Sequence, residues 1–166
     1  ISGADRAGLL AGTIKNGAVI RNVTVSGYVY SEQDAGGIAA VLCGSGKGTA
    51  AGTQIQESDG SVIVENCRAE GIAMNSAGTD GAVGGIAGKA EKAYLVDNVV
   101  ITQNGVSDRI HGKGYIGGIA GIMNQSGIYN SYVNGTIGGN GSRAAGGIIG
   151  KYESGNLILA RMAGSI

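Results

Sequence analysis

The sequence contains no proline, phenylalanine or tryptophan, and it has one histidine, two cysteines and seven tyrosines in 166 residues. Because there is neither a C-x-x-C pair nor a group of histidines, we expect no metal site and no bound cofactor. Cys43 and Cys67 are too few to define a disulfide framework. They form one bridge if the protein is secreted, or they remain two small apolar thiols. His111, in "DRIHGKG", is expected to lie in a loop.

Charge and hydropathy exclude two further classes of protein. Twelve basic residues balance twelve acidic ones and no basic run occurs, so no nucleic-acid partner is expected. No apolar run approaches the ~18 residues of a membrane-spanning helix, so we expect no membrane insertion. The chain starts "ISGADRAG" without a methionine, and we expect it to be a piece of a longer protein with flanking domains.

Glycine is abundant instead. It makes up 34 of the 166 residues, whereas glycine accounts for about 7% of an average chain. A glycine-aliphatic core recurs roughly every 30 residues, which indicates a repeat architecture. The core glycines are Gly8, Gly37, Gly85, Gly118 and Gly147. A second block follows each core: "IRNVTVSG", "VENCRAEG", "VDNVVITQ", "IYNSYVNG" and "LILARMAG". The second repeat is longer, and its glycine-rich stretch 43–60 is predicted to be an insertion loop.

The repeat length and the glycines together select the fold. Repeats of this length can be helical, but each interior glycine costs a helix about 0.5–1 kcal/mol, so helices are disfavoured. Short strands separated by tight turns remain. We therefore predict an all-β chain, residues 1–166, that forms one parallel β-solenoid domain of about five coils.

When the five copies of the second block are aligned, each position forms a column, and we predict for each column whether its side chains point inward or outward. The first position is aliphatic and predicted to point inward: Ile20, Val64, Val96, Ile128 and Leu157. The third position is predicted to form a bend, because asparagine tolerates the left-handed conformation. It is occupied by Asn22, Asn66, Asn98, Asn130 and finally Leu159, where a ladder of stacked amides should end.

The outward columns supply the candidate site residues. Arg21, Glu65 and Asp97 are predicted to share one column, with Arg21 and Glu65 forming an ion pair and Glu65 stacked over Asp97. Two alternatives stay open for these carboxylates: solvated surface, or the acid pair of a carbohydrate-active enzyme. Tyr129 and Tyr132 are predicted to face outward, either as an interaction surface for a host protein or glycan or as cover for apolar surface.

The stretches "VGGIAGKAEKAYLVDNVVITQNG" and "IGGIAGIMNQSGIYNSYVNGTIGG" resemble GLUG repeats, with a G-G-[LI]-[VA]-G core and a segment I-x-N-[CS]-[YV]-[AV]-x-G. Such repeats occur in secreted or surface bacterial proteins, including adhesin-like proteins and the N-terminal region of IgA1-specific zinc metalloendopeptidases. The resemblance implies a right-handed, extracellular, non-catalytic solenoid and transfers no catalytic residue. The protease motif H-E-x-x-H is absent from this sequence. We therefore expect a structural or interaction module rather than an enzyme.

Overall fold

The computed structural model describes residues 1–46, 59–102, 110–139 and 141–166. Within these ranges the regular elements are β-strands, and they form three sheets of ten, five and five parallel strands. The ten-stranded sheet A is strongly curled, because the long strand β4 pairs with β7 in its first part and with β1 and β8 in its second. The prediction of an all-β, parallel, solenoid-like chain is confirmed at this level.

The strands of sheet A, in spatial order, are β17 (Ala144–Gly146), β13 (Tyr115–Gly117), β8 (Ala82–Gly84), β4 (Thr24–Gly36), β7 (Arg68–Ser76), β11 (Val99–Thr102), β16 (Tyr132–Thr136) and β20 (Arg161–Ser165), with β1 (Ala4–Gly8) on β4 and β12 (Ile110–Gly112) on β7. Sheet B is ordered β18 (Ile149–Tyr152), β14 (Ala120–Asn124), β9 (Ala87–Glu91), β5 (Ala39–Cys43) and β2 (Ala11–Lys15). Sheet C is ordered β19 (Gly155–Ile158), β15 (Ser126–Tyr129), β10 (Ala93–Val96), β6 (Val62–Glu65) and β3 (Val19–Arg21).

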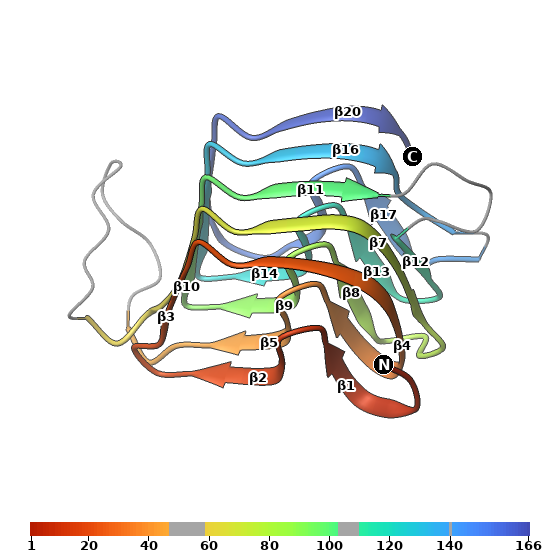
Figure 1. Ribbon diagram of the computed structural model, residues 1–166, viewed down its shortest axis with the longest axis horizontal. Coiled ribbons are helices and arrows are strands. Elements are labelled where there is room, and N and C mark those ends of the chain that lie inside the picture. The colour runs from red at the N-terminus through yellow and green to blue at the C-terminus, as the bar shows by residue number, and fades with distance from the viewer. Residues whose placement is uncertain (47–58, 103–109, 140) are drawn as a thin grey trace.

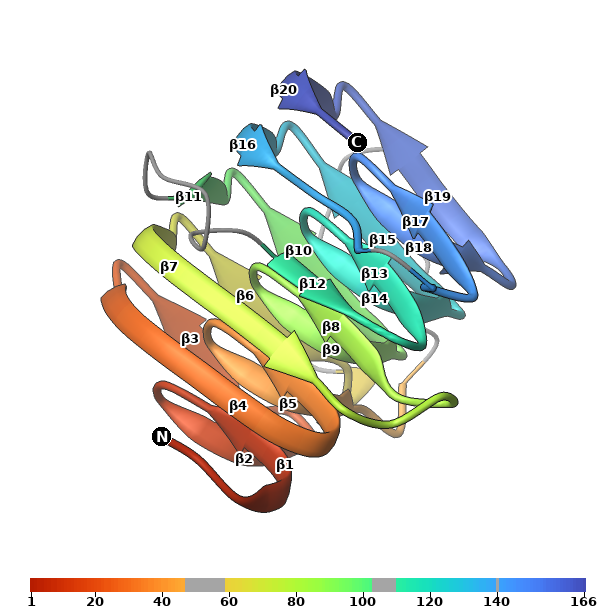
Figure 2. The same ribbon diagram turned by 90° about the vertical axis from the view of Figure 1, so that its right-hand side faces the viewer.

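The chain visits the sheets in a fixed rotation, from sheet A to B to C and back to A. Figure 1 shows the result, with β7, β11, β16 and β20 stacked along one side and β2, β5, β9 and β14 along the opposite side. The two termini lie toward opposite ends of the stack (Figure 2). Each pass thus adds one layer, and equivalent residues of successive repeats become hydrogen-bonded neighbours.

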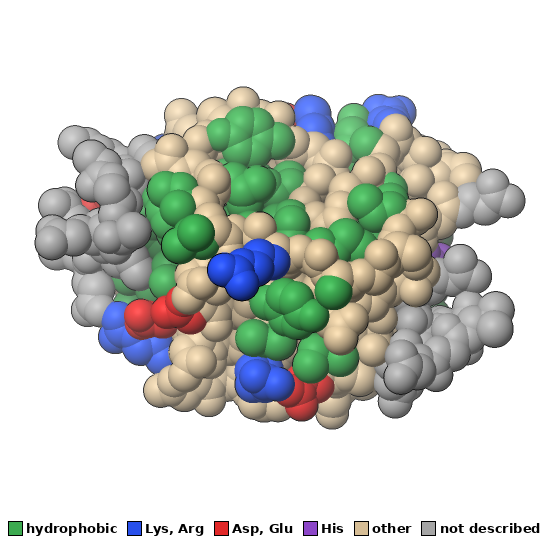
Figure 3. Space-filling model, turned by 90° about the horizontal axis from the view of Figure 1, so that it is seen from above, with side chains coloured by type: hydrophobic (Ala, Val, Ile, Leu, Met, Phe, Trp, Pro, Cys, Tyr) green, Lys and Arg blue, Asp and Glu red, His purple; other side chains and the backbone are tan. Residues whose placement is uncertain are grey.

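Apolar columns fill the space between the sheets. Val64, Leu95 and Ile128 are neighbours on β6, β10 and β15, and each is fully buried. They belong to one hydrophobic cluster that extends through the stack. At the last layer the same column is uncovered, since Leu157 is 46% exposed. Figure 3, seen from the side where β20 lies uppermost in Figure 1, shows several groups of hydrophobic side chains on this surface.

The core glycines Gly37, Gly85 and Gly118 are needed because neighbouring layers approach too closely there for a side chain. A Cβ at Gly85 would overlap the carbonyl oxygen of Gly118 in the next layer and lie 2.5 Å from a Val100 methyl. The predicted glycine alignment is wrong in the first repeat, where Gly8 pairs with Gly36 rather than Gly37. The amide of Leu9 instead donates to the Gly37 carbonyl, so the first layer has leucine where later layers have glycine.

The bend of the second block is present in all five repeats, but the third repeat reaches it one residue earlier than predicted. Left-handed φ angles of 57°, 50°, 53°, 44° and 54° occur at Asn22, Asn66, Asp97, Asn130 and Leu159. The bend residue is therefore Asp97 and not Asn98. Likewise Leu95, not Val96, is the inward residue that pairs with Val64. Aspartate also tolerates the left-handed region, so residue type alone does not separate the two positions.

Most of the predicted insertion loop, 43–60, lies outside the described residues. Among the described residues, β5 ends at Cys43 and the following strand, β6, begins at Val62. The turn before β6 is stabilised by Asp59, whose carboxylate accepts a hydrogen bond from the Ser61 amide at 2.8 Å.

Candidate functional site

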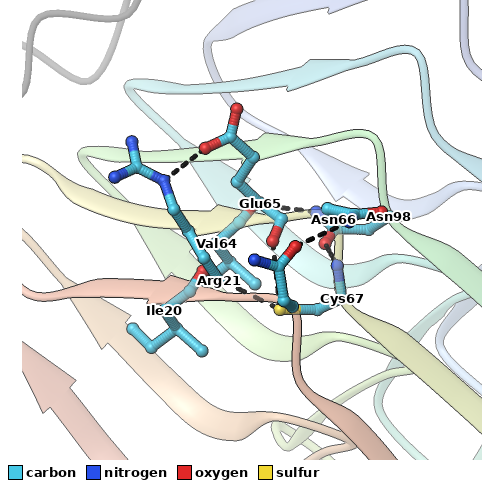
Figure 4. Close-up of polar contacts among 8 residues, drawn as sticks. Ile20, Arg21, Val64, Glu65, Asn66, Cys67 and Asn98 are labelled. Atoms are coloured by element: carbon cyan, nitrogen blue, oxygen red, sulfur yellow. Dashed lines mark hydrogen bonds and ion pairs between the residues drawn. The ribbon is translucent and has the colours of Figure 1, made fainter.

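In the first three repeats, residues that follow the strands of sheet C form hydrogen bonds between neighbouring layers (Figure 4). The Asn66 amide donates to the Asn22 side-chain oxygen at 2.7 Å, as the predicted ladder requires. In the third repeat Asn98 has turned inward and is fully buried. Its amide donates to the Val64 carbonyl at 2.9 Å, and its oxygen accepts the Cys67 backbone N–H at 3.0 Å. Asn98 thus links two layers from within.

The predicted carboxylate column is only partly present. Arg21 and Glu65 are neighbours and form an ion pair, with Nε and Oε2 separated by 2.5 Å. The predicted stacking of Glu65 over Asp97 is wrong, because Val96 is the neighbour of Glu65 on β10. Asp97 lies at the bend, where its carboxylate accepts a hydrogen bond from the Asn130 amide at 2.6 Å. Both carboxylates therefore stabilise contacts between layers.

The two candidate tyrosines differ in exposure. Tyr132, at the start of β16, is 36% exposed and faces outward as predicted. The prediction that Tyr129 is exposed is wrong, since only 6% of it is accessible. Gly127 leaves room on the outside of sheet C, and the Tyr129 ring fills the space over it. Tyr129 packs with Ile63 and with Tyr94, the two ring centroids being 6.5 Å apart.

A pocket of about 320 Å³ lies on the outer side of sheet A. We refer to it as the Tyr30 pocket. Its lining consists of Tyr30, Asn75, Ser76, Ala77, His111, Gly112, Lys113 and Gly139. Tyr30 pairs with Asn75 across β4 and β7, and Asn75 pairs with His111 across β7 and β12. The expectation that His111 lies in a loop is therefore wrong, because it is the central residue of β12.

Alternation along these three strands fixes which way the side chains point. Val29, Met74 and Ile110 precede the pocket residues on their strands and are fully buried in the core. Because successive strand residues point to opposite faces, Tyr30, Asn75 and His111 point outward together. An aromatic ring, an amide and an imidazole therefore stand side by side on one rigid surface.

A second polar hollow, of about 380 Å³, is lined by Asp5, Arg6, Gln33, Asp34 and Lys89. The Asp34 side chain is only 2% exposed. Its carboxylate lies 3.1 Å from the Lys89 ammonium and 3.8 Å from Arg6, and it accepts the Ala82 backbone N–H at 3.0 Å. This buried anion is paired and hydrogen-bonded, which is what its burial requires, so it joins layers rather than awaiting a ligand.

No protein-family model matches the sequence, and searches of curated proteins and of solved structures give no significant match. The site must therefore be interpreted from its own chemistry. Among the described residues, no group of three or more His, Cys, Asp or Glu is arranged to hold a metal ion. Over the same residues no helix is long and apolar enough to cross a membrane.

The two cysteines are separate thiols in the structure. Cys67 is fully buried, and Cys43 is half-buried at the end of β5. Burial raises the pKa of the Cys67 thiol, although backbone hydrogen bonds at Val23 and Glu65 act in the opposite direction. Burial also raises the pKa of Tyr94, reinforced by the negative charge of Asp59.

Sequence reasoning missed the Tyr30 pocket and the Asp34 cluster. Tyr30, Asp34, Asn75 and His111 lie in segments between the second block and the next glycine core, which are outside the repeat consensus. The one available signal was alternation in "YVYSEQD", which places Tyr28, Tyr30 and Glu32 on one face of an extended strand. That strand pairs with 68–76, which in turn pairs with 110–112, and no local sequence pattern predicts these pairings.

Proposed function

We propose that residues 1–166 form a right-handed β-solenoid of five coils that serves as a non-catalytic structural or interaction module of a secreted or surface-attached bacterial protein. Sheets B and C support the coil number, since each contains five strands. The resemblance of the repeats to GLUG repeats supports the handedness and the extracellular setting. Flanking domains of a longer protein, including a zinc metalloprotease, are compatible partners for such a module.

The observation that carries this proposal is the structural use of the two carboxylates that an enzyme of this shape would need. Glu65 is paired with Arg21, and Asp97 is hydrogen-bonded to Asn130 at the neighbouring bend. A glycosidase acid and base must both face a bound sugar, separated by about 5–9.5 Å, with at least one able to exchange a proton with it. Glu65 and Asp97 occupy different columns and have other partners.

The experiment separates a binding module from the alternative, a carbohydrate-active enzyme. The purified chain is incubated with a panel of neutral and acidic polysaccharides, and new reducing ends and unsaturated sugars are measured. We expect no product, and retardation of the chain in gels that contain a polysaccharide ligand. Product formation that is lost in both Glu65→Gln and Asp97→Asn would overturn the proposal in favour of the enzyme. Product that persists in both variants would also overturn it and place catalysis elsewhere.

A further inference from the structure

The Tyr30 pocket has the rigidity of a preformed binding site. Its three central side chains stand on adjacent parallel strands, so their backbones are spaced about 4.8 Å apart. Each strand is anchored by an inward neighbour, Val29, Met74 or Ile110, that is fully buried. A ligand that fits this surface loses little affinity to ordering the protein, because the sheet already fixes the three positions.

The chemistry of the three side chains matches that of a sugar ring. Tyr30 offers an aromatic face, to which the C–H groups on one side of a pyranose can pack, and a hydroxyl. Asn75 offers two donors and one acceptor for sugar hydroxyls, and His111 lies beside it on β12. The volume, about 320 Å³, lies at the lower end of the ~300–1,000 Å³ that is usual for small-molecule sites.

The charge of the pocket selects among sugars. Lys113 lines the rim and is exposed, and none of the described lining residues is an aspartate or glutamate. Gly139 closely approaches β12 at the edge of the pocket, since an added Cβ would come within 3.1 Å of the Gly112 carbonyl oxygen and 3.3 Å of the His111 Cβ. On these grounds we propose that the Tyr30 pocket binds a pyranose unit that carries a carboxylate, as in a uronic or a sialic acid. The inference rests on the proposed function as an interaction module and names its ligand class.

The single histidine makes the test direct. His111 is the only histidine in the chain, so its two imidazole C–H signals in a proton NMR spectrum need no further assignment. The chain is titrated with methyl galacturonoside, N-acetylneuraminic acid, neutral methyl galactoside and sodium acetate. Both acidic sugars should shift the His111 signals saturably. The neutral sugar should bind more weakly, and acetate should give no saturable shift.

Variants assign the contacts. Lys113→Gln should lower the affinity for the acidic sugars about tenfold and leave that for the neutral sugar unchanged, since it removes one charge-assisted hydrogen bond. Tyr30→Ala should abolish sugar binding, whereas Tyr30→Phe should retain most of it. Lys15→Gln, an exposed lysine on β2, is the matched control and should bind like wild type. Far-UV circular dichroism confirms that each variant is folded.

Three results would overturn the inference: no saturable shift with either acidic sugar, an equal response to acetate, or unchanged affinity in both Lys113→Gln and Tyr30→Ala. If the His111 signals stay fixed while the chain still binds polysaccharide in a gel, the pocket proposal fails and the interaction module stands. If polysaccharide is cleaved, the proposed function fails independently of the pocket.

Discussion

Replacing Asn98 with leucine should strongly destabilise the protein, because Asn98 is an interior residue whose side chain bonds two backbone groups. It accepts from the Cys67 N–H and donates to the Val64 carbonyl while being fully buried. Leucine has a similar size but can satisfy neither group. Its own extra burial offsets only part of the loss.

The magnitude follows from the two groups left without partners. Each unsatisfied buried backbone group costs about 1–3 kcal/mol, so the pair costs about 2–6 kcal/mol. Gaining a buried leucine side chain returns about 1.5–3 kcal/mol at most. Taking the middle of each range, the net loss expected for Asn98→Leu is about 2 kcal/mol, and it reaches about 4.5 kcal/mol at most. That is a large fraction of the ~5–15 kcal/mol that stabilises a typical domain.

Urea denaturation followed by far-UV circular dichroism measures the effect, and the matched substitution is Asn66→Leu. Asn66 is exposed at the bend and donates one hydrogen bond, to Asn22. Leucine already occupies the equivalent bend at Leu159, so Asn66→Leu should cost only about 0.5–1.5 kcal/mol, which combines strain at the bend with the loss of one exposed hydrogen bond. If Asn98→Leu lies within about 0.5 kcal/mol of wild type, or below the cost of Asn66→Leu, the interior placement of Asn98 is refuted.

Further outcomes are expected at other positions. Leu159→Asn should stabilise the chain by about 0.5–1 kcal/mol in thermal melts, because leucine is strained at a φ of 54°; a lower melting temperature would contradict this. Gly85→Ala should destabilise by more than about 3 kcal/mol or prevent folding, because a Cβ overlaps the next layer; near wild-type stability would exclude that close approach. Arg21→Ala should cost only about 0–1 kcal/mol, and less at high salt, because its partner Glu65 is also partly exposed; a larger cost would show a stronger pair. Raising the pH above the ordinary cysteine pKa of about 8.5 should reduce the free energy of unfolding. The Cys67 pKa is raised in the folded state, so the unfolded chain loses the thiol proton first. A free energy of unfolding that increases over this pH range would contradict a raised Cys67 pKa.

The fold class could be predicted from the sequence because the repeat consists of residue types that each suit one structural role. Glycines at positions such as Gly85 are required by close approach of layers, and they also exclude helices. Aliphatic residues at alternating positions then mark strands, and Asn22, Asn66 and Asn130 mark the bends. These signals are local, and the structure confirms them.

The register of the third repeat could not be predicted because "VDNVV" contains two residues that suit a left-handed bend. Asp97 and Asn98 are adjacent, and choosing between them requires knowing what lies inside the next layer. The structure places Asn98 inside, where its side chain pairs with the Cys67 backbone N–H and the Val64 carbonyl. The one-residue error reversed the predicted face of Val96 and created an apparent stack of carboxylates.

The candidate site was only partly predictable for a related reason. Tyr129 occupies an outward position, as its column indicated, but Gly127 lets its ring lie flat against the sheet. The Tyr30 pocket is assembled from four segments that are distant in sequence and become neighbours only in the folded chain. Aligning the repeats predicts whether a residue of the repeat points inward or outward. A pocket depends on which segments outside the repeat consensus become neighbours in space.

A methyl NOE spectrum tests the stacked register most directly. The structure predicts that the methyl groups of Leu95 give cross-peaks to both Val64 and Ile128, its neighbours in the layers on either side. Val96, which points outward beside Glu65, should give none to that pair. Cross-peaks from Val96 to Val64 and Ile128, with none from Leu95, would contradict the register and with it the placement of Asp97 and Asn98.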